Sequence, residues 1–193
     1  MPRSPIALAI YAGWLTFLLF WWWRARDNKP AQRGEAFAPR FFKYVLPLIV
    51  AILLIEPLRF YSNNWLGERF LPHGWLFPVL GATLVWLGVL LCCWARIVLG
   101  RNWSSVVQIK QDHELVRNGP YRVVRHPIYS GLLLAFLGTA LAIGEWRGLL
   151  ATAVAAGSFW IKLRLEERWM RERFGEAYVD YMRHSKALVP WLI

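Results

Sequence analysis

Long uncharged stretches are the feature that most constrains how this chain folds. Residues 5–23 contain no charged side chain, residues 70–95 contain only His73 as an ionisable group at neutral pH, and residues 127–144 contain none. A helix of 19 residues rises about 28 Å, close to the ~30 Å hydrocarbon core of a bilayer. The three runs lack the polar residue at every third or fourth position that a soluble amphipathic helix shows. They therefore predict helices embedded in a membrane.

Two further apolar segments complete the pattern. Residues 41–61 are interrupted by Glu56, Pro57 and Arg59, and residues 148–161 are short for a full crossing. We predict an all-α polytopic membrane protein with about five transmembrane helices, and whether the fourth and fifth both cross fully stays open. The first run is too long for a cleaved signal peptide, and bulky Trp and Arg residues stand where small residues would mark a cleavage site.

The basic residues gather in three segments that alternate with the apolar runs. Although 57% of the chain is hydrophobic, its formal net charge is +11, and residues 24–43, 96–125 and 162–186 hold 19 of the 23 Lys and Arg residues. This asymmetry predicts that the three segments face the cytosol, with the N-terminus outside and the C-terminus inside. The charge is spread over juxtamembrane segments facing anionic membrane lipids, without a nucleic-acid-binding motif, so we expect no nucleic-acid partner.

Polar chemistry is concentrated where the second basic segment meets the fourth apolar run. Gly119-Pro120 predicts a turn, and Pro127 suits the first turn of a helix, so Arg125 and His126 should lie at the membrane surface. Tyr129 would lie one turn further along the helix. Singly, His126 could cap the helix and Tyr129 could be an interfacial aromatic. The density of His, Arg and Tyr side chains here nevertheless favours a functional site.

A second polar cluster follows the fifth apolar run, and we expect the helix to continue into it. Glu166 and Glu167 would stand at the membrane boundary, where a carboxylate is costly unless it is paired or solvated. Lys162 lies four residues before Glu166, and Arg164 lies three residues before Glu167, so ordinary intrahelical ion pairs are one interpretation. Alternatively, the carboxylates bind the ammonium group of an amino-acid-like cofactor. Phe174-Gly175 should end this helix, and a short helix should follow.

Known signatures of soluble enzymes and metal sites are missing from the sequence. There is no dinucleotide-binding, phosphate-loop, zinc-protease or nucleophile-elbow motif. Cys92 and Cys93 are adjacent, and neighbouring side chains on a helix diverge by about 100°, so we predict no shared metal site. No feature of the sequence specifies an oligomeric state.

The spacing of these motifs resembles the isoprenylcysteine carboxyl methyltransferase family, whose wider group of membrane methyltransferases includes the phospholipid N-methyltransferases. The resemblance covers residues 100–190 and rests on Gly-Pro-Tyr at 119–121, Arg-His-Pro-Ile-Tyr at 125–129, Glu166-Glu167 and Phe-Gly-Glu-Ala-Tyr at 174–178. It implies a chain of three N-terminal transmembrane helices in residues 1–99 and a catalytic region in residues 100–193, in which a loop, the hairpin 127–161 and C-terminal helices enclose S-adenosylmethionine.

The resemblance also implies roles for individual residues. A cofactor-binding set would comprise Gln108, His113, Leu115, Val116, Tyr121, Arg125, His126, Pro127, Tyr129, Glu166 and Glu167. Gln108 is only the nearest counterpart of a family Gln. The family's substrate-contacting Arg falls at Lys162, so either Lys162 or the nearby Arg164 would hold the acceptor, beside Glu166.

Several functions are compatible with this set of residues. A carboxylate acceptor is already ionised at neutral pH, so methyl transfer needs alignment rather than a base. An amine acceptor would require a proton acceptor such as His126 or Glu166. We therefore expect an S-adenosylmethionine-dependent methyltransferase acting on a prenylcysteine-like or other lipophilic acceptor. A lipid amine N-methyltransferase, a sterol-reductase-like NADPH enzyme and a non-catalytic scaffold are the alternatives.

Overall fold

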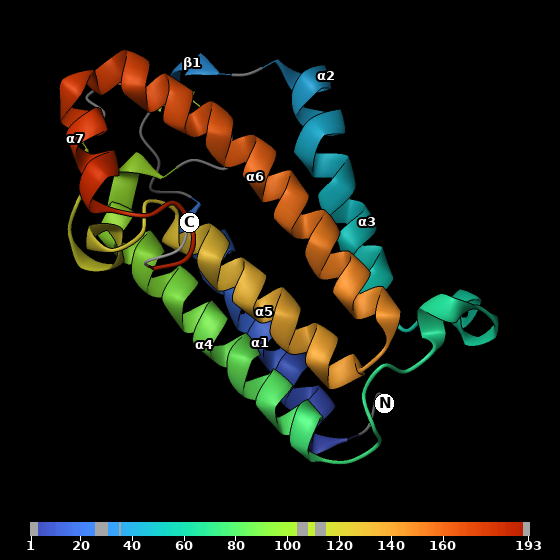
Figure 1. Ribbon diagram of the computed structural model, residues 1–193. Helices are drawn as coiled ribbons and strands as arrows, with labels where there is room; N and C mark the ends of the chain where they lie inside the picture. The colour runs from blue at the N-terminus through green and yellow to red at the C-terminus, as the bar shows by residue number, and fades with distance from the viewer. Residues whose placement is uncertain (1–3, 26–30, 35, 104–107, 111–114, 191–193) are drawn as a thin grey trace.

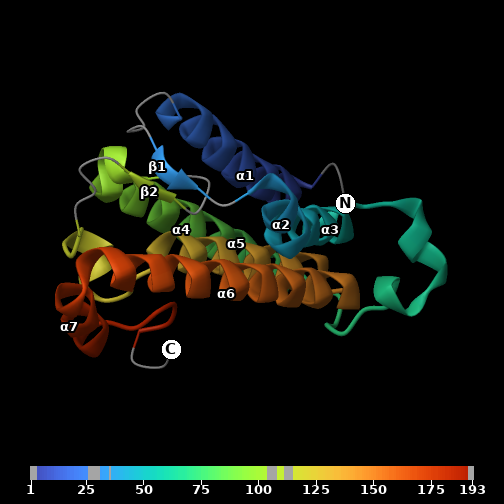
Figure 2. The same ribbon diagram turned by 90° about the horizontal axis from the view of Figure 1, so that it is seen from above.

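The computed structural model is a bundle of helices, and it describes residues 4–25, 31–34, 36–103, 108–110 and 115–190 (Figure 1). Helices of this part of the chain are α1 (Pro5–Arg24), α2 (Phe37–Arg40), α3 (Leu46–Ile55), α4 (Leu76–Leu99), α5 (Pro127–Ile143), α6 (Trp146–Phe174) and α7 (Glu176–His184). A π-helical turn, Phe41–Val45, joins α2 to α3. Seen from above, α4 and α5 lie between α1 on one side and α6 on the other (Figure 2).

The apolar runs form the helices that the sequence predicts. In the described residues, α1, Phe37–Ile55, α4 and α6 are long and apolar enough to cross a membrane, whereas α5 has 17 residues and is shorter. The chain is thus an integral membrane protein. The second apolar run is helical only as far as Ile55 because Pro57 disfavours helix at the residue before it, and short 3-10 turns follow.

Helix α6 is longer than its apolar portion, as predicted, and it carries the polar cluster out of the bundle. It extends over 29 residues to Phe174, where Gly175 adopts a positive φ of 54° and α7 begins at Glu176. A left-handed backbone at this position favours glycine and ends the helix. Lys162, Glu166 and Glu167 therefore lie on one uninterrupted helix.

Helices α4 and α5 form the closest pair in the bundle because glycines face each other along an antiparallel seam. A Cβ added at Gly81 would lie 2.4 Å from the carbonyl oxygen of Gly138, and one at Gly88 would lie 2.3 Å from that of Gly131. The glycines are seven residues apart on both helices, so the same face returns after two turns. Close backbone approach at small residues is how membrane helices gain packing energy.

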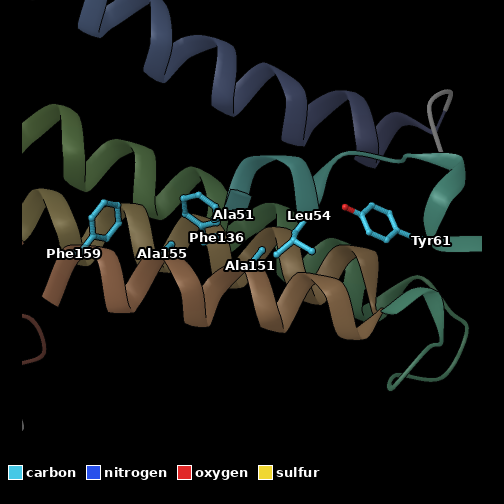
Figure 3. Packing of buried hydrophobic residues seen from close by; sticks show 7 residues of the cluster. All are labelled: Ala51, Leu54, Tyr61, Phe136, Ala151, Ala155 and Phe159. Carbon is cyan, nitrogen blue, oxygen red and sulfur yellow. The ribbon is translucent and has the colours of Figure 1, made fainter. Parts of the chain in front are cut away.

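The main apolar core joins α3, α5 and α6 (Figure 3). Phe136 of α5 and Phe159 of α6 are 3% and 4% exposed, and Ala51, Ala151 and Ala155 let the helices approach. At the end of this core, Arg147 is buried and its Nη1 donates to the carbonyl oxygens of Leu54 and Ile55. These carbonyls belong to the last turn of α3, so the arginine caps α3 and attaches it to α6.

The described residues of all three basic segments lie at one end of the bundle, which we call the loop end (Figure 1). A two-stranded antiparallel sheet pairs β1 (Ala31–Gly34) from the first segment with β2 (Gln108–Lys110) from the second. A bridge between Val124 and Lys186 joins the second to the third. The small sheet adds to the predicted all-α architecture without changing it, and the shared location agrees with the charge pattern of the sequence.

Candidate active site

At the loop end, a histidine from the start of α5 lies between two carboxylates of α6. His126 Nδ1 is 3.5 Å from Glu166 Oε2, and His126 Nε2 is 3.5 Å from Glu167 Oε1. The His126 side chain is 10% exposed, and its Nε2 has no partner with hydrogen-bond geometry among the described residues. His126 occupies the N-cap position of α5 but makes no side-chain capping bond. The simple capping role is therefore excluded.

Arg125 completes the cluster from the other side of Glu167. Its Nε donates to Glu167 Oε1 at 2.7 Å, and the two side chains are 9% and 5% exposed. Its Nη1 donates to the carbonyl oxygen of Ser185, which follows α7. The backbone N–H groups of Arg125 and His126 donate to the carbonyls of Lys186 and Ala187. The C-terminal segment thus fixes the orientation of both side chains.

Tyr129 links the carboxylates to the aromatic core. Its hydroxyl donates to Glu166 Oε1 at 2.7 Å. Its ring is stacked between those of His126 and Phe159, with centroid distances of 5.5 and 5.1 Å. Lys162 Nζ lies 5.4 Å from the centroid of the same ring. The site therefore presents carboxylates, a cation and an aromatic stack within two turns of α6.

Burial and the two carboxylates act oppositely on His126. Burial alone lowers the pKa of its imidazole, but interactions with Glu166 and Glu167 outweigh burial and raise the pKa above the ordinary value of 6.5. His126 consequently retains its proton to higher pH than an exposed histidine does. A protonated imidazole between two carboxylates stabilises the cluster and is a poor proton acceptor.

The other predicted cofactor residues differ in how much of their surroundings the structure describes. Tyr121 is 6% exposed, and its carbonyl accepts a hydrogen bond from Tyr181 Oη of α7 at 2.5 Å. Pro127 is buried at the first position of α5. Leu115 and Val116 are half-buried in the segment before Tyr121. The backbone of Gln108 lies in β2, whereas His113 lies outside the described residues.

The two candidate acceptor-binding cations lie on different faces of α6. Lys162 is half-buried against Tyr129, whereas Arg164 is exposed with its guanidinium over the ring of Trp160. Glu166 accepts a hydrogen bond from Tyr129 of α5, and Glu167 accepts one from Arg125, two residues before α5. The intrahelical interpretation of these carboxylates therefore missed their partners outside α6.

One aromatic residue of this region was not anticipated from the sequence. Tyr44 belongs to the π-helical turn before α3, is 5% exposed, and its ring centroid is 6.0 Å from Lys162 Nζ. It lies 118 positions before Lys162 in a run whose only evident property is hydrophobicity. Pro47, which follows the turn, was the available sign that this helix is irregular.

Comparison with known proteins shows the family of the chain. The family model described as Phospholipid methyltransferase matches residues 76–177, slightly more than half of the chain. The chain belongs to this family. The family of membrane methyltransferases that the sequence motifs resemble is thereby confirmed, and the protein is a membrane methyltransferase that requires a methyl donor. The matched region of this chain contains α4, α5 and α6. It also contains every residue of the group that we call the His126 cluster, which comprises Arg125, His126, Tyr129, Lys162, Glu166 and Glu167.

Two curated relatives are similar to this chain over about three quarters of its length. Protein-S-isoprenylcysteine O-methyltransferase B of Arabidopsis thaliana is 29% identical over 77% of this chain and 74% of its own. The cobalt-zinc-cadmium resistance protein CzcN of Cupriavidus metallidurans is 32% identical over 75% of this chain and 62% of its own.

A solved structure shares the fold. The structure of the eukaryotic intramembrane Ras methyltransferase ICMT superposes with a TM-score of 0.54 at 23% identity. The comparison covers 96% of this chain and 63% of that protein, so this methyltransferase corresponds to under two thirds of the larger structure. The likeness supports the all-helical membrane fold.

Proposed function

We propose that this methyltransferase transfers a methyl group from S-adenosylmethionine to the carboxylate of a prenylcysteine-like or other lipophilic acceptor. The observation that carries the proposal is the cluster at the loop end, where the paired carboxylates Glu166 and Glu167 and the cation Lys162 lie within two turns of α6. The names of the curated relatives, which include several protein-S-isoprenylcysteine O-methyltransferases, agree with it.

The residues present fit S-adenosylmethionine by the chemistry of their side chains. Glu166 supplies a carboxylate for the ammonium group of the cofactor, and Tyr129 holds that carboxylate in position. The buried His126 Nε2 lies 3.5 Å from Glu167 Oε1 and has no partner with hydrogen-bond geometry in the described part of the chain, so a ligand can compete with Glu167 for it. Aromatic faces attract a sulfonium cation, and Tyr121 and Tyr129 provide such faces.

The reaction requires alignment more than proton transfer. When bound, S-adenosylmethionine supplies a methyl group that an acceptor oxygen takes as the C–O bond forms and the C–S bond breaks, with the electron pair passing to sulfur. Lys162 holds the acceptor carboxylate so that the acceptor oxygen can align with the methyl carbon and the sulfur. Helix α6 fixes the distance between Lys162 and Glu166. Bringing two reactants together in this way converts a bimolecular step into an effectively unimolecular one.

The protonation state of the cluster favours a carboxylate over an amine. An ammonium acceptor must lose a proton before attack, and Glu166 and Glu167 raise the pKa of His126, so its neutral, proton-accepting form is scarcer at a given pH than that of an ordinary histidine. Arg125 and Tyr129 already bind the two carboxylates. Methylation of a lipid amine is the second candidate, because the matching family model is that of phospholipid methyltransferases. Family membership favours both over NADPH-dependent reduction.

The proposed access routes follow from the charge asymmetry. We assign the loop end to the cytosol, where the soluble cofactor is present, with the N-terminus on the opposite side. A lipophilic acceptor would arrive laterally from the bilayer and place only its polar group at Lys162.

The proposal is tested with purified protein in detergent, radiolabelled S-adenosylmethionine and either a farnesylcysteine carboxylate or phosphatidylethanolamine. We expect label on the farnesylcysteine, released as methanol by base because a methyl ester is base-labile and a methylamine is not. Base-stable label on the amine alone would replace the proposal with the second candidate. Isothermal titration with S-adenosylhomocysteine checks the cofactor separately, and no binding by folded protein would contradict it.

A further inference from the structure

Tyr44 is a buried tyrosine whose ring lies beside Lys162 and whose hydroxyl has no role in the proposed reaction. The side chain is 5% exposed, and its hydroxyl oxygen is enclosed without a hydrogen-bond partner among the residues that the structure describes. Leaving a buried hydroxyl unpaired is costly, on the order of 1–3 kcal/mol, so such groups normally have a partner. A hydroxyl like this therefore points to a ligand that supplies the acceptor atom.

The backbone at Tyr44 has an unusual conformation that fixes the residue against α6. Phe41–Val45 is a π turn, closed by a bond from the Leu46 N–H to the Phe41 carbonyl. Such turns are rare and often lie at functional sites. Ser158 Oγ donates to the Tyr44 carbonyl at 3.1 Å. Ser158 is one helical turn before Lys162, so this bond places Tyr44 on the face of α6 that carries the lysine.

The side chain of Tyr44 extends along that face. It packs with Trp169 and Leu165 in a small buried cluster. Lys162 Nζ is flanked by two tyrosine rings, since it lies 6.0 Å from the centroid of Tyr44 and 5.4 Å from that of Tyr129. The hydroxyl of Tyr129 already donates to Glu166. Of the two hydroxyls, only that of Tyr44 has no acceptor among the described residues.

We propose that the Tyr44 hydroxyl donates a hydrogen bond to the carboxylate of the methyl acceptor, which Lys162 holds by charge. This inference rests on the proposed function. Two donors of different kinds on an anion give both affinity and orientation, because a hydrogen bond to a charged acceptor is stronger than a neutral one. The tyrosine keeps its proton throughout, so methyl transfer remains balanced. Tyr44 then contributes to selecting a carboxylate over a neutral or cationic headgroup.

The test is Tyr44→Phe in the full chain, which removes the hydroxyl and keeps the ring beside Lys162. We expect the KM for a farnesylcysteine carboxylate to rise about 10-fold or more, in line with loss of a charge-assisted bond. Affinity for S-adenosylhomocysteine should stay within about twofold. The ratio of carboxylate to neutral farnesylcysteine amide binding, measured by competition, should fall by a similar factor.

Tyr61→Phe is the matched control. Tyr61 is also buried, and its hydroxyl donates to the Leu53 carbonyl at 3.1 Å, at the opposite end of α3. The acceptor KM of this variant should not change. This inference alone would be overturned if the wild-type protein esterifies the carboxylate and the Tyr44→Phe variant does so with an unchanged KM. Wild-type protein that methylates only amines would overturn the proposed function and this inference together.

Discussion

Arg125 and Glu167 form a buried ion pair in which Arg125 Nε lies 2.7 Å from Glu167 Oε1. The arginine precedes α5, the glutamate lies on α6, and the same arginine reaches the carbonyl of Ser185 beyond α7. The pair therefore joins three segments that all contribute to the His126 cluster.

Glu167→Gln should destabilise the protein by about 3 kcal/mol, because removing one partner leaves the other charge buried and uncompensated. Thermal unfolding in detergent measures the loss. Asp180→Asn is the control, since Asp180 is 54% exposed where it pairs with Arg117. Exposed pairs contribute about 0–1 kcal/mol. Equal destabilisation by the two variants would show that the Arg125–Glu167 pair does not stabilise the fold.

Glu166→Gln should weaken S-adenosylhomocysteine binding at least about 10-fold, because it removes the charge proposed to hold the cofactor ammonium. The substitution keeps the shape of the side chain, which is needed because Tyr129 donates to it. Isothermal titration measures the effect. Glu172→Gln, at an exposed position of the same helix, should bind normally. Normal binding by Glu166→Gln would remove Glu166 from the cofactor site.

The His126 cluster should make stability depend on pH. Because the pKa of His126 is raised in the folded protein, its stabilising contribution is complete below the unfolded value of about 6.5 and is lost as pH rises through the folded pKa. The difference in Tm between wild type and His126→Gln should therefore shrink as the pH rises above about 6.5. A difference that grows with pH would contradict the assignment.

The glycine seam between α4 and α5 gives a prediction about packing. Gly88→Ala should destabilise the protein by about 2 kcal/mol, because the new Cβ would lie 2.3 Å from the Gly131 carbonyl oxygen and must separate the helices. Gly157→Ala on α6 is the control, because a Cβ there would have no atom of the described residues within 4 Å beyond its own stretch of helix. That change should be neutral or slightly stabilising. Comparable losses in both variants would refute the role of the seam.

Much of the fold follows from the sequence because membrane helices are signalled by the absence of charge. The runs at 5–23 and 127–144 become α1 and α5 almost residue for residue. The paired β1 and β2 strands were not predicted, since three or four residues without alternation carry no strand signal. The register of α4 against α5 was also beyond the sequence, because glycines are common in membrane helices and only the pairing of particular ones defines a seam.

Part of the candidate site could likewise be predicted from the sequence, and part could not. Two short motifs indicated the site, one with Arg125, His126 and Tyr129 and the other with Glu166. The spacing of the motifs predicted a common site, and the structure brings these side chains together. The partner of Glu167 could not be read from helical spacing, which offers only residues three or four positions away. Tyr44 was missed because a contact across more than a hundred residues between apolar segments leaves no local pattern.

The continuity of helix α6 limits the insertions that the site can tolerate. Lys162 and Glu166 are one turn apart on a continuous rod, so the spacing between the two proposed ligand groups is set by about 6 Å of helical rise rather than by the bundle. The helix therefore sets the distance between the acceptor held by Lys162 and the cofactor held by Glu166. A single residue inserted between these positions would rotate Glu166 by about 100° away from Tyr129 while leaving the apolar runs of the sequence unchanged.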